Sequence, residues 1–155
     1  SDEEILNAIR AYASTFQMKA IAKSTPEIRA RFIRLAVKQA KEASRYGGDA
    51  CYKLLKTTLD VTKVFPKTLI DEEMSITTDA MASNFMAPAG YSKATFDTLV
   101  PTLFSDMNVS EINAIAEPKE NQVQSTCPAL VKFYEAIDRL PAKNKDIVTY
   151  GLLNS

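Results

Sequence analysis

Few side chains of this chain could act as catalysts or metal ligands. Its 155 residues include no histidine, so no imidazole can act as a general base near neutral pH, activate a nucleophile or bind a metal. Three consecutive acids, Asp71, Glu72 and Glu73, could be read as a carboxylate site, but neighbours in a helix point in different directions and acids favour helix N-termini. The residues favour a non-enzymatic protein and predict no cofactor and no metal site.

Two cysteines, Cys51 and Cys127, are the remaining candidates for chemistry. They lie too far apart in the sequence for a CxxC motif, and a thiol nucleophile at Cys127 would have no histidine base. We therefore expect a structural disulfide in an oxidising compartment, with two buried thiols in a reducing cytosol as the alternative. The chain begins at Ser1 with an acidic run and no initiator Met, as in a processed or truncated product, so we expect a periplasmic or secreted location, with the cytoplasm as the alternative.

Apolar residues recur at helical spacing along nearly the whole chain, which predicts an all-α fold. Prolines, glycines and cap residues divide the sequence into a single-domain helical bundle of about seven helices over residues 1–155, with no membrane-spanning run. Asp49, Ser92 and Ser110 are the expected caps of three helices, Pro101 should kink or split another, and 118–126 should be an exposed loop. The helices are expected to begin near residues 2, 26, 49, 71, 92, 108, 127 and 141, and the first should turn one apolar stripe toward the core: Ile5, Ile9, Tyr12, Phe16 and Ala20.

Five cations form the most specific surface pattern, at spacings of three and four within the predicted helix 26–46. At about 100° per residue they fall within a sector of roughly 80°, opposite the apolar face of that helix. The stripe could dock an acidic protein surface, or it could be a solvated face partly neutralised by Glu27 and Glu42. We do not expect nucleic acid to bind, because the net charge is zero and the aromatic residues lie on other faces. The stripe consists of Arg31, Arg34, Lys38, Lys41 and Arg45.

The zero net charge conceals two oppositely charged halves. Residues 1–66 carry 12 Lys and Arg against 7 Asp and Glu, and residues 67–155 carry 7 against 12. The halves could compensate each other within one molecule, pair between copies in a homo-oligomer, or face a charged partner.

A third group of residues, rich in Met and Phe, surrounds the predicted break at Pro88 and Gly90. Such residues could line a pocket for an apolar or anionic lipid-like ligand, or they could be ordinary core. The first functional hypothesis is thus a protein-binding domain, such as an inhibitor, immunity-type factor, adaptor or chaperone, and the alternative is a carrier of a lipid-like ligand. The candidate pocket residues are Met74, Met81, Phe85, Met86 and Phe96.

Overall fold

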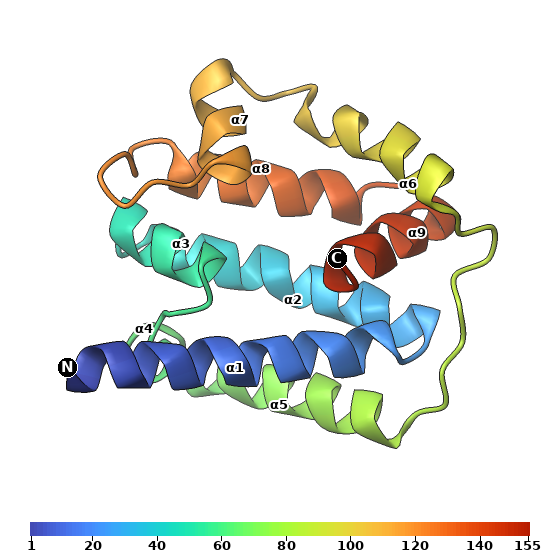
Figure 1. The fold of residues 1–155 in the computed structure, drawn as a ribbon, viewed down its shortest axis with the longest axis horizontal. Helices are drawn as coiled ribbons and strands as arrows, with labels where there is room; N and C mark the ends of the chain where they lie inside the picture. The colour runs from blue at the N-terminus through green and yellow to red at the C-terminus, as the bar shows by residue number, and fades with distance from the viewer.

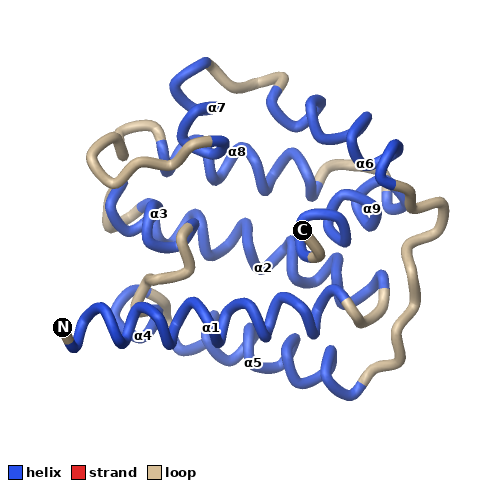
Figure 2. Tube along the Cα trace, in the orientation of Figure 1, coloured by secondary structure: helices blue, strands red, loops and turns tan.

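Nine α-helices and one short 3-10 helix make up the fold, and no strand is present (Figures 1 and 2). The computed structural model describes residues 1–155. The all-α prediction is confirmed, although the helices outnumber the seven or eight expected. The elements are α1 (Asp2–Ala22), α2 (Pro26–Ser44), α3 (Gly48–Leu55), α4 (Val61–Val64), α5 (Lys67–Ala82), α6 (Lys93–Leu99), η1 (Val100–Phe104), α7 (Val109–Ala116), α8 (Thr126–Asp138) and α9 (Ala142–Leu153).

Most helix starts follow the local sequence signals. The Thr25 side chain accepts a hydrogen bond from the Ile28 amide, and Pro26 takes the first helical position, where its missing N–H costs nothing. Ser92 caps α6 in the same way, as expected. Pro101 ends the regular α-helix, and the chain continues as the 3-10 helix η1, so the predicted split is confirmed.

Four local predictions were wrong. The helix expected to begin near Asp71 begins a full turn earlier, at Lys67, because Pro66 precedes its first turn, and the acids 71–73 lie in its second turn. The apolar stripe from Cys51 to Phe65 predicts one helix that ends before Pro66, but α3 stops at Leu55. Thr57 takes a left-handed φ of 61°, and Asp60 then caps the separate four-residue helix α4. Asp49 does not cap α3, which begins one residue earlier, and it pairs instead with Lys53. The residue that caps α7 is Asn108 and not Ser110, because Asn108 and Glu111 form a reciprocal capping box.

Helix α2 lies at the centre of the bundle and packs against α8, α5, α3 and α9 (Figure 1). One of its faces, with Ile28 and Leu35, belongs to the larger apolar core, which also takes in α3 and α5. Another face contributes Ile33 to a second core beneath η1, α8 and α9. The two cores on α2 fix the relative positions of the other helices.

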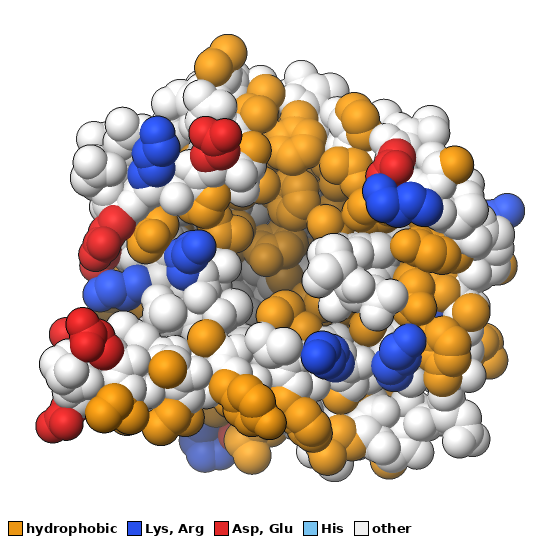
Figure 3. Space-filling view, viewed as in Figure 1, with side chains coloured by type: hydrophobic (Ala, Val, Ile, Leu, Met, Phe, Trp, Pro, Cys, Tyr) orange, Lys and Arg blue, Asp and Glu red, His pale blue; other side chains and the backbone are white.

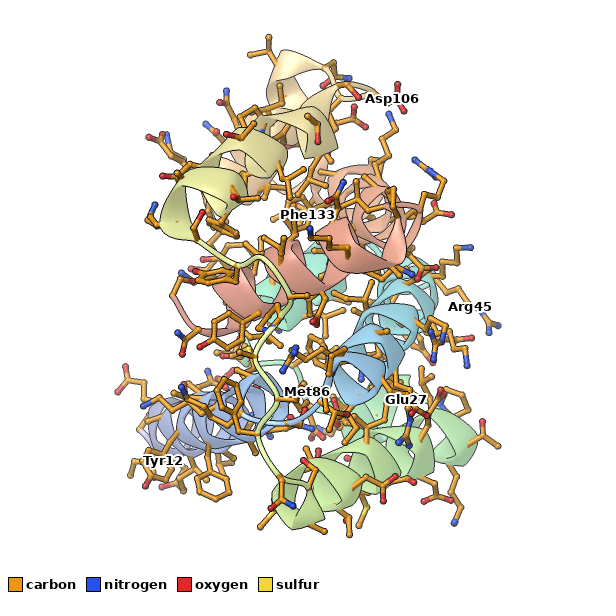
Figure 4. The ribbon with its side chains drawn as sticks, turned by 90° about the vertical axis from the view of Figure 1, so that its right-hand side faces the viewer. Tyr12, Glu27, Arg45, Met86, Asp106 and Phe133 are labelled. Carbon is orange, nitrogen blue, oxygen red and sulfur yellow. A yellow bond between two sulfur atoms is a disulfide. The ribbon has the colours of Figure 1, made fainter.

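A buried ion pair joins α2 to α9. The Arg29 side chain is fully buried and pairs in bidentate fashion with Asp146, with Nε–Oδ1 and Nη2–Oδ2 distances of 2.6 and 2.9 Å. The same guanidinium donates to the carbonyls of Ala22, Ser24 and Met86, so all of its donors have partners. Residues 83–92 run in extended form along one edge of the bundle from α5 to α6, and Met86 ties them to this ion pair (Figures 2 and 4).

The two cysteines join α3 to α8. Cys51 is fully buried, Cys127 is the second residue of α8, and the structure pairs them in a disulfide with Cα atoms 5.3 Å apart. The predicted pairing is confirmed. No helix combines the length and the apolar character that crossing a bilayer requires.

Candidate functional site

Helix α1 lies on the surface with its polar side turned inward. Its apolar stripe, expected to face the core, is exposed instead, and Figure 3 shows hydrophobic side chains along this helix. Only Ile21 and Ala22, in the last turn, are buried. The exposed fractions are 60% for Ile5, 58% for Ile9, 77% for Tyr12 and 55% for Phe16. The prediction was wrong because helical periodicity identifies an apolar face without saying which way the bundle turns it.

The inward side of α1 borders a cleft of about 600 Å³, and Figure 3 shows an apolar hollow between α1 and the helices above it. Side chains from α1, α2, α3, α5 and α8 and from the α3–α4 connection line it, and 11 of its 19 lining residues are hydrophobic. This volume falls within the range typical of small-molecule sites. The apolar lining includes Phe32, Ala36, Leu54, Leu55, Leu59 and Met74.

Polar contacts hold the walls of the cleft together. Gln17 on α1 donates to the Thr77 hydroxyl on α5 at 2.7 Å, and Gln39 on α2 donates to Glu73 at 2.9 Å. Arg10 forms an ion pair with Asp60, 3.4 Å away, which joins α1 to the start of α4. The two charged side chains that line the cleft, Arg10 and Glu73, are therefore both engaged by the protein.

The Tyr134 side chain, on α8, carries one of two cleft hydroxyls that form no hydrogen bond within the protein, the other being that of Ser14 on α1. Tyr134 is half-buried among apolar residues of both cores and packs edge-on against Phe133. Burial alone raises the pKa of Tyr134, with no hydrogen bond contributing to the shift, and the hydroxyl takes part in none of the protein's hydrogen bonds. Tyr134 thus stays protonated in neutral solution and can offer a hydrogen bond to a molecule in the cleft.

The five Met and Phe residues proposed as a pocket do not gather in one. Met74, Met81 and Met86 are all mostly exposed, at 63%, 62% and 58%, and of the three only Met74 borders the cleft. Phe85 stacks on Tyr150, and the ring of Phe96 lies against Gly151. The prediction of a shared pocket is corrected: the extended run of 83–92 separates Met74 and Met81 from Phe96, and only Met74 belongs to the cleft.

The basic stripe of α2 is largely paired with acids of neighbouring helices. Two of its cations meet α5, since Arg31 pairs with Asp79 at 2.8 Å and Lys38 pairs with Glu72 at 3.0 Å. Lys41 reaches Glu135 on α8 at 3.6 Å, Arg45 reaches Glu42 at 3.4 Å, and Arg34 forms no ion pair. Figure 4 shows Glu27 and Arg45 along this outer side of α2. Part of the opposite charge of the two halves of the chain is thus compensated within the molecule.

Sequence reasoning did not identify the cleft. The apolar spacing of α8 places Tyr134 on an inward face, but it gives no sign that the hydroxyl would lack a partner. The visible signal was on α1, where Arg10, Ser14 and Gln17 share the face opposite Tyr12. Nowhere in the structure do three or more His, Cys, Asp or Glu side chains converge as a metal site would require.

Comparisons of the chain with protein-family models, curated proteins and solved structures find no match.

Proposed function

We propose that this protein is a non-enzymatic binding protein that holds an apolar small molecule in the cleft beside α1. The observation that carries the proposal is a largely apolar cleft of about 600 Å³ whose lining includes two residues, Tyr134 and Ser14, with hydroxyls that no protein group engages. Natural ligand sites combine an apolar lining with a few polar groups that fix orientation. The absence of histidine from the sequence supports binding over catalysis.

The lining favours an uncharged ligand that carries one hydrogen-bonding group. Arg10 and Glu73, the two charged side chains of the cleft, have opposite signs and already have partners in Asp60 and Gln39. A charged ligand would have to displace one of these contacts or remain unpaired in an apolar space, which costs free energy. A neutral molecule can be held by the unengaged hydroxyls of Tyr134 and Ser14 without breaking either contact.

The proposal is tested with N-phenyl-1-naphthylamine, a neutral apolar dye whose fluorescence rises in apolar surroundings. Because the chain contains no tryptophan, no indole emission overlaps the signal. We expect saturable binding of one dye per chain, with a Kd on the order of micromolar. The Tyr134→Phe variant should bind roughly three- to tenfold more weakly, since one hydrogen bond contributes about 0.5–1.5 kcal/mol.

A matched pair of leucine variants locates the binding site. Leu55 lines the cleft and Leu99 packs against the second core, and both are half-buried. Leu55→Phe should narrow the cleft and weaken dye binding, whereas Leu99→Phe should leave it unchanged; neither introduces an indole, and circular dichroism confirms that both variants fold. Equal dye binding by the two variants, or no saturable binding by the unmodified chain, would refute the proposal.

We also place the protein in an oxidising compartment, periplasmic or extracellular. The support is the Cys51–Cys127 disulfide, since such bonds are rare in a reducing cytosol. In protein from its natural source, the two thiols should resist alkylation under denaturing conditions until a reductant is added, as intact mass spectrometry would report. Alkylation without reduction would favour the cytoplasm.

Docking of an acidic protein partner on the basic stripe remains a prediction. It now has less support, because four of its five cations already have carboxylate partners and only Arg34 is without one.

A further inference from the structure

The outer face of α1 carries exposed apolar residues at the spacing of a coiled-coil seam. Ile5, Ile9, Tyr12 and Phe16 follow one another at spacings of four, three and four, which is the alternation of d and a positions in a heptad repeat. All four are more than half exposed, and Tyr12 lies on the outer side of α1 in Figure 4. A contiguous apolar surface of this kind marks an interaction site.

We propose that this face binds the α1 helix of a second copy of the chain in antiparallel orientation. A second copy fits because, in antiparallel orientation, the aliphatic residues of one helix lie opposite the aromatic residues of the other. If residue i is placed opposite residue 21 − i, Ile5 meets the partner's Phe16 and Ile9 meets the partner's Tyr12. Every layer then pairs an aliphatic side chain with an aromatic one, and a two-fold axis relates the layers.

The charges at the two ends of the seam agree with this register. In the heptad pattern, the position before Ile5 is Asp2 and the position after Phe16 is Lys19. The antiparallel register that pairs residue i with residue 21 − i also places Asp2 opposite the partner's Lys19. A parallel pair would instead place Asp2 against Asp2 and Lys19 against Lys19, which is unfavourable. The seam runs from Asp2 to Lys19, about 26 Å at 1.5 Å per residue.

The positions that flank the seam carry no charge, so nothing at its edges opposes the approach of a second helix. Apart from one leucine, the side chains there are small and allow two helices to lie close together. These flanking residues are Leu6, Ala8, Ala13, Thr15 and Ala20, of which all but Ala20 are exposed.

Sedimentation of the purified chain tests the proposal. We expect the mass to rise with concentration from 17.1 kDa to twice that value between about 10 and 300 μM. The Ile9→Glu variant places a carboxylate next to the two-fold axis and should weaken dimerisation by roughly 100-fold or more. Ile9 is mostly exposed, so circular dichroism and thermal unfolding of the variant should stay close to those of the unmodified chain.

A charge reversal distinguishes a second copy in this register from any other arrangement. Asp2→Lys and Lys19→Asp should each weaken the dimer roughly fivefold, because each juxtaposes like charges at both ends of the seam. The double variant D2K/K19D should recover the original Kd. A chain that stays monomeric throughout the concentration range, a dimer insensitive to Ile9→Glu, or a double variant that does not recover would each overturn the proposal.

Discussion

Removal of the Asp146 carboxylate should destabilise the fold far more than removal of any surface acid. Arg29 has no exposed surface, and Asp146 supplies two of its five hydrogen bonds and the only opposite charge paired with it. In Asp146→Asn the buried guanidinium keeps its charge, loses its counter-charge and faces an amide N–H₂ in place of one acceptor oxygen. Breaking a buried ion pair in this way costs about 3–5 kcal/mol.

The lower end of that range is expected here, because three backbone carbonyls still surround the guanidinium. With a urea m-value of about 2 kcal/mol/M, a loss of about 3 kcal/mol lowers the unfolding midpoint by roughly 1.5 M. It lowers Tm by roughly 6–12 °C for a chain of this length. Urea unfolding followed by far-UV circular dichroism measures the effect.

Asp79→Asn is the matched control, since Asp79 makes a 2.8 Å ion pair with Arg31 at the surface. Exposed pairs contribute at most about 1 kcal/mol. The double variant R29M/D146L should not regain full stability, because the carbonyls of Ala22, Ser24 and Met86 would lose their donor. If Asp146→Asn and Asp79→Asn unfold within about 0.5 kcal/mol of each other, the role given to the buried pair is wrong.

Two further perturbations concern α8. Replacing Cys51 and Cys127 together by Ala should lower the free energy of unfolding by about 2–4 kcal/mol, because the disulfide closes a long loop in the unfolded chain; an unchanged urea midpoint would contradict this. Hydrogen bonds from Lys132 and from the Asn108 amide lower the pKa of Glu111 below its ordinary value of 4.5. Since the folded pKa is the lower one, this contribution to stability is complete above about pH 4.5 and is lost as the pH falls through the folded value. Urea midpoints measured down to acid pH should therefore fall less steeply for Glu111→Gln than for the unmodified chain, and parallel curves would show that Glu111 contributes nothing.

Local signals in the sequence predicted most of the helix boundaries and the disulfide. Thr25 with Pro26, and Ser92, act within one turn of the chain, so their effect does not depend on the rest of the fold. The pairing of Cys51 with Cys127 followed from the count of two cysteines rather than from geometry. The break at Thr57, which was missed, depends on a single left-handed residue that no turn motif indicates.

The candidate site could not be predicted because it depends on how α1 is oriented. The amphipathic pattern of α1 is clear, but only the assembled bundle shows that Arg10 and Gln17 face the cleft while Ile9 faces outward. Arg29 could have been found, since it shares a helical face with Ala36 and Ala40, and a cation on an apolar face requires a buried partner. Its partner Asp146 lies more than 100 residues away and had no comparable signal.

Methyl NMR shows most directly whether the cleft beside α1 is a binding site. The chain is titrated with N-phenyl-1-naphthylamine. The methyl signals of the cleft residues Leu54, Leu55 and Leu59 should shift and saturate together, while those of Leu103 and Leu152 in the second core stay in place. Shifts confined to the second core, or no saturable shift at the three cleft leucines, would contradict the account.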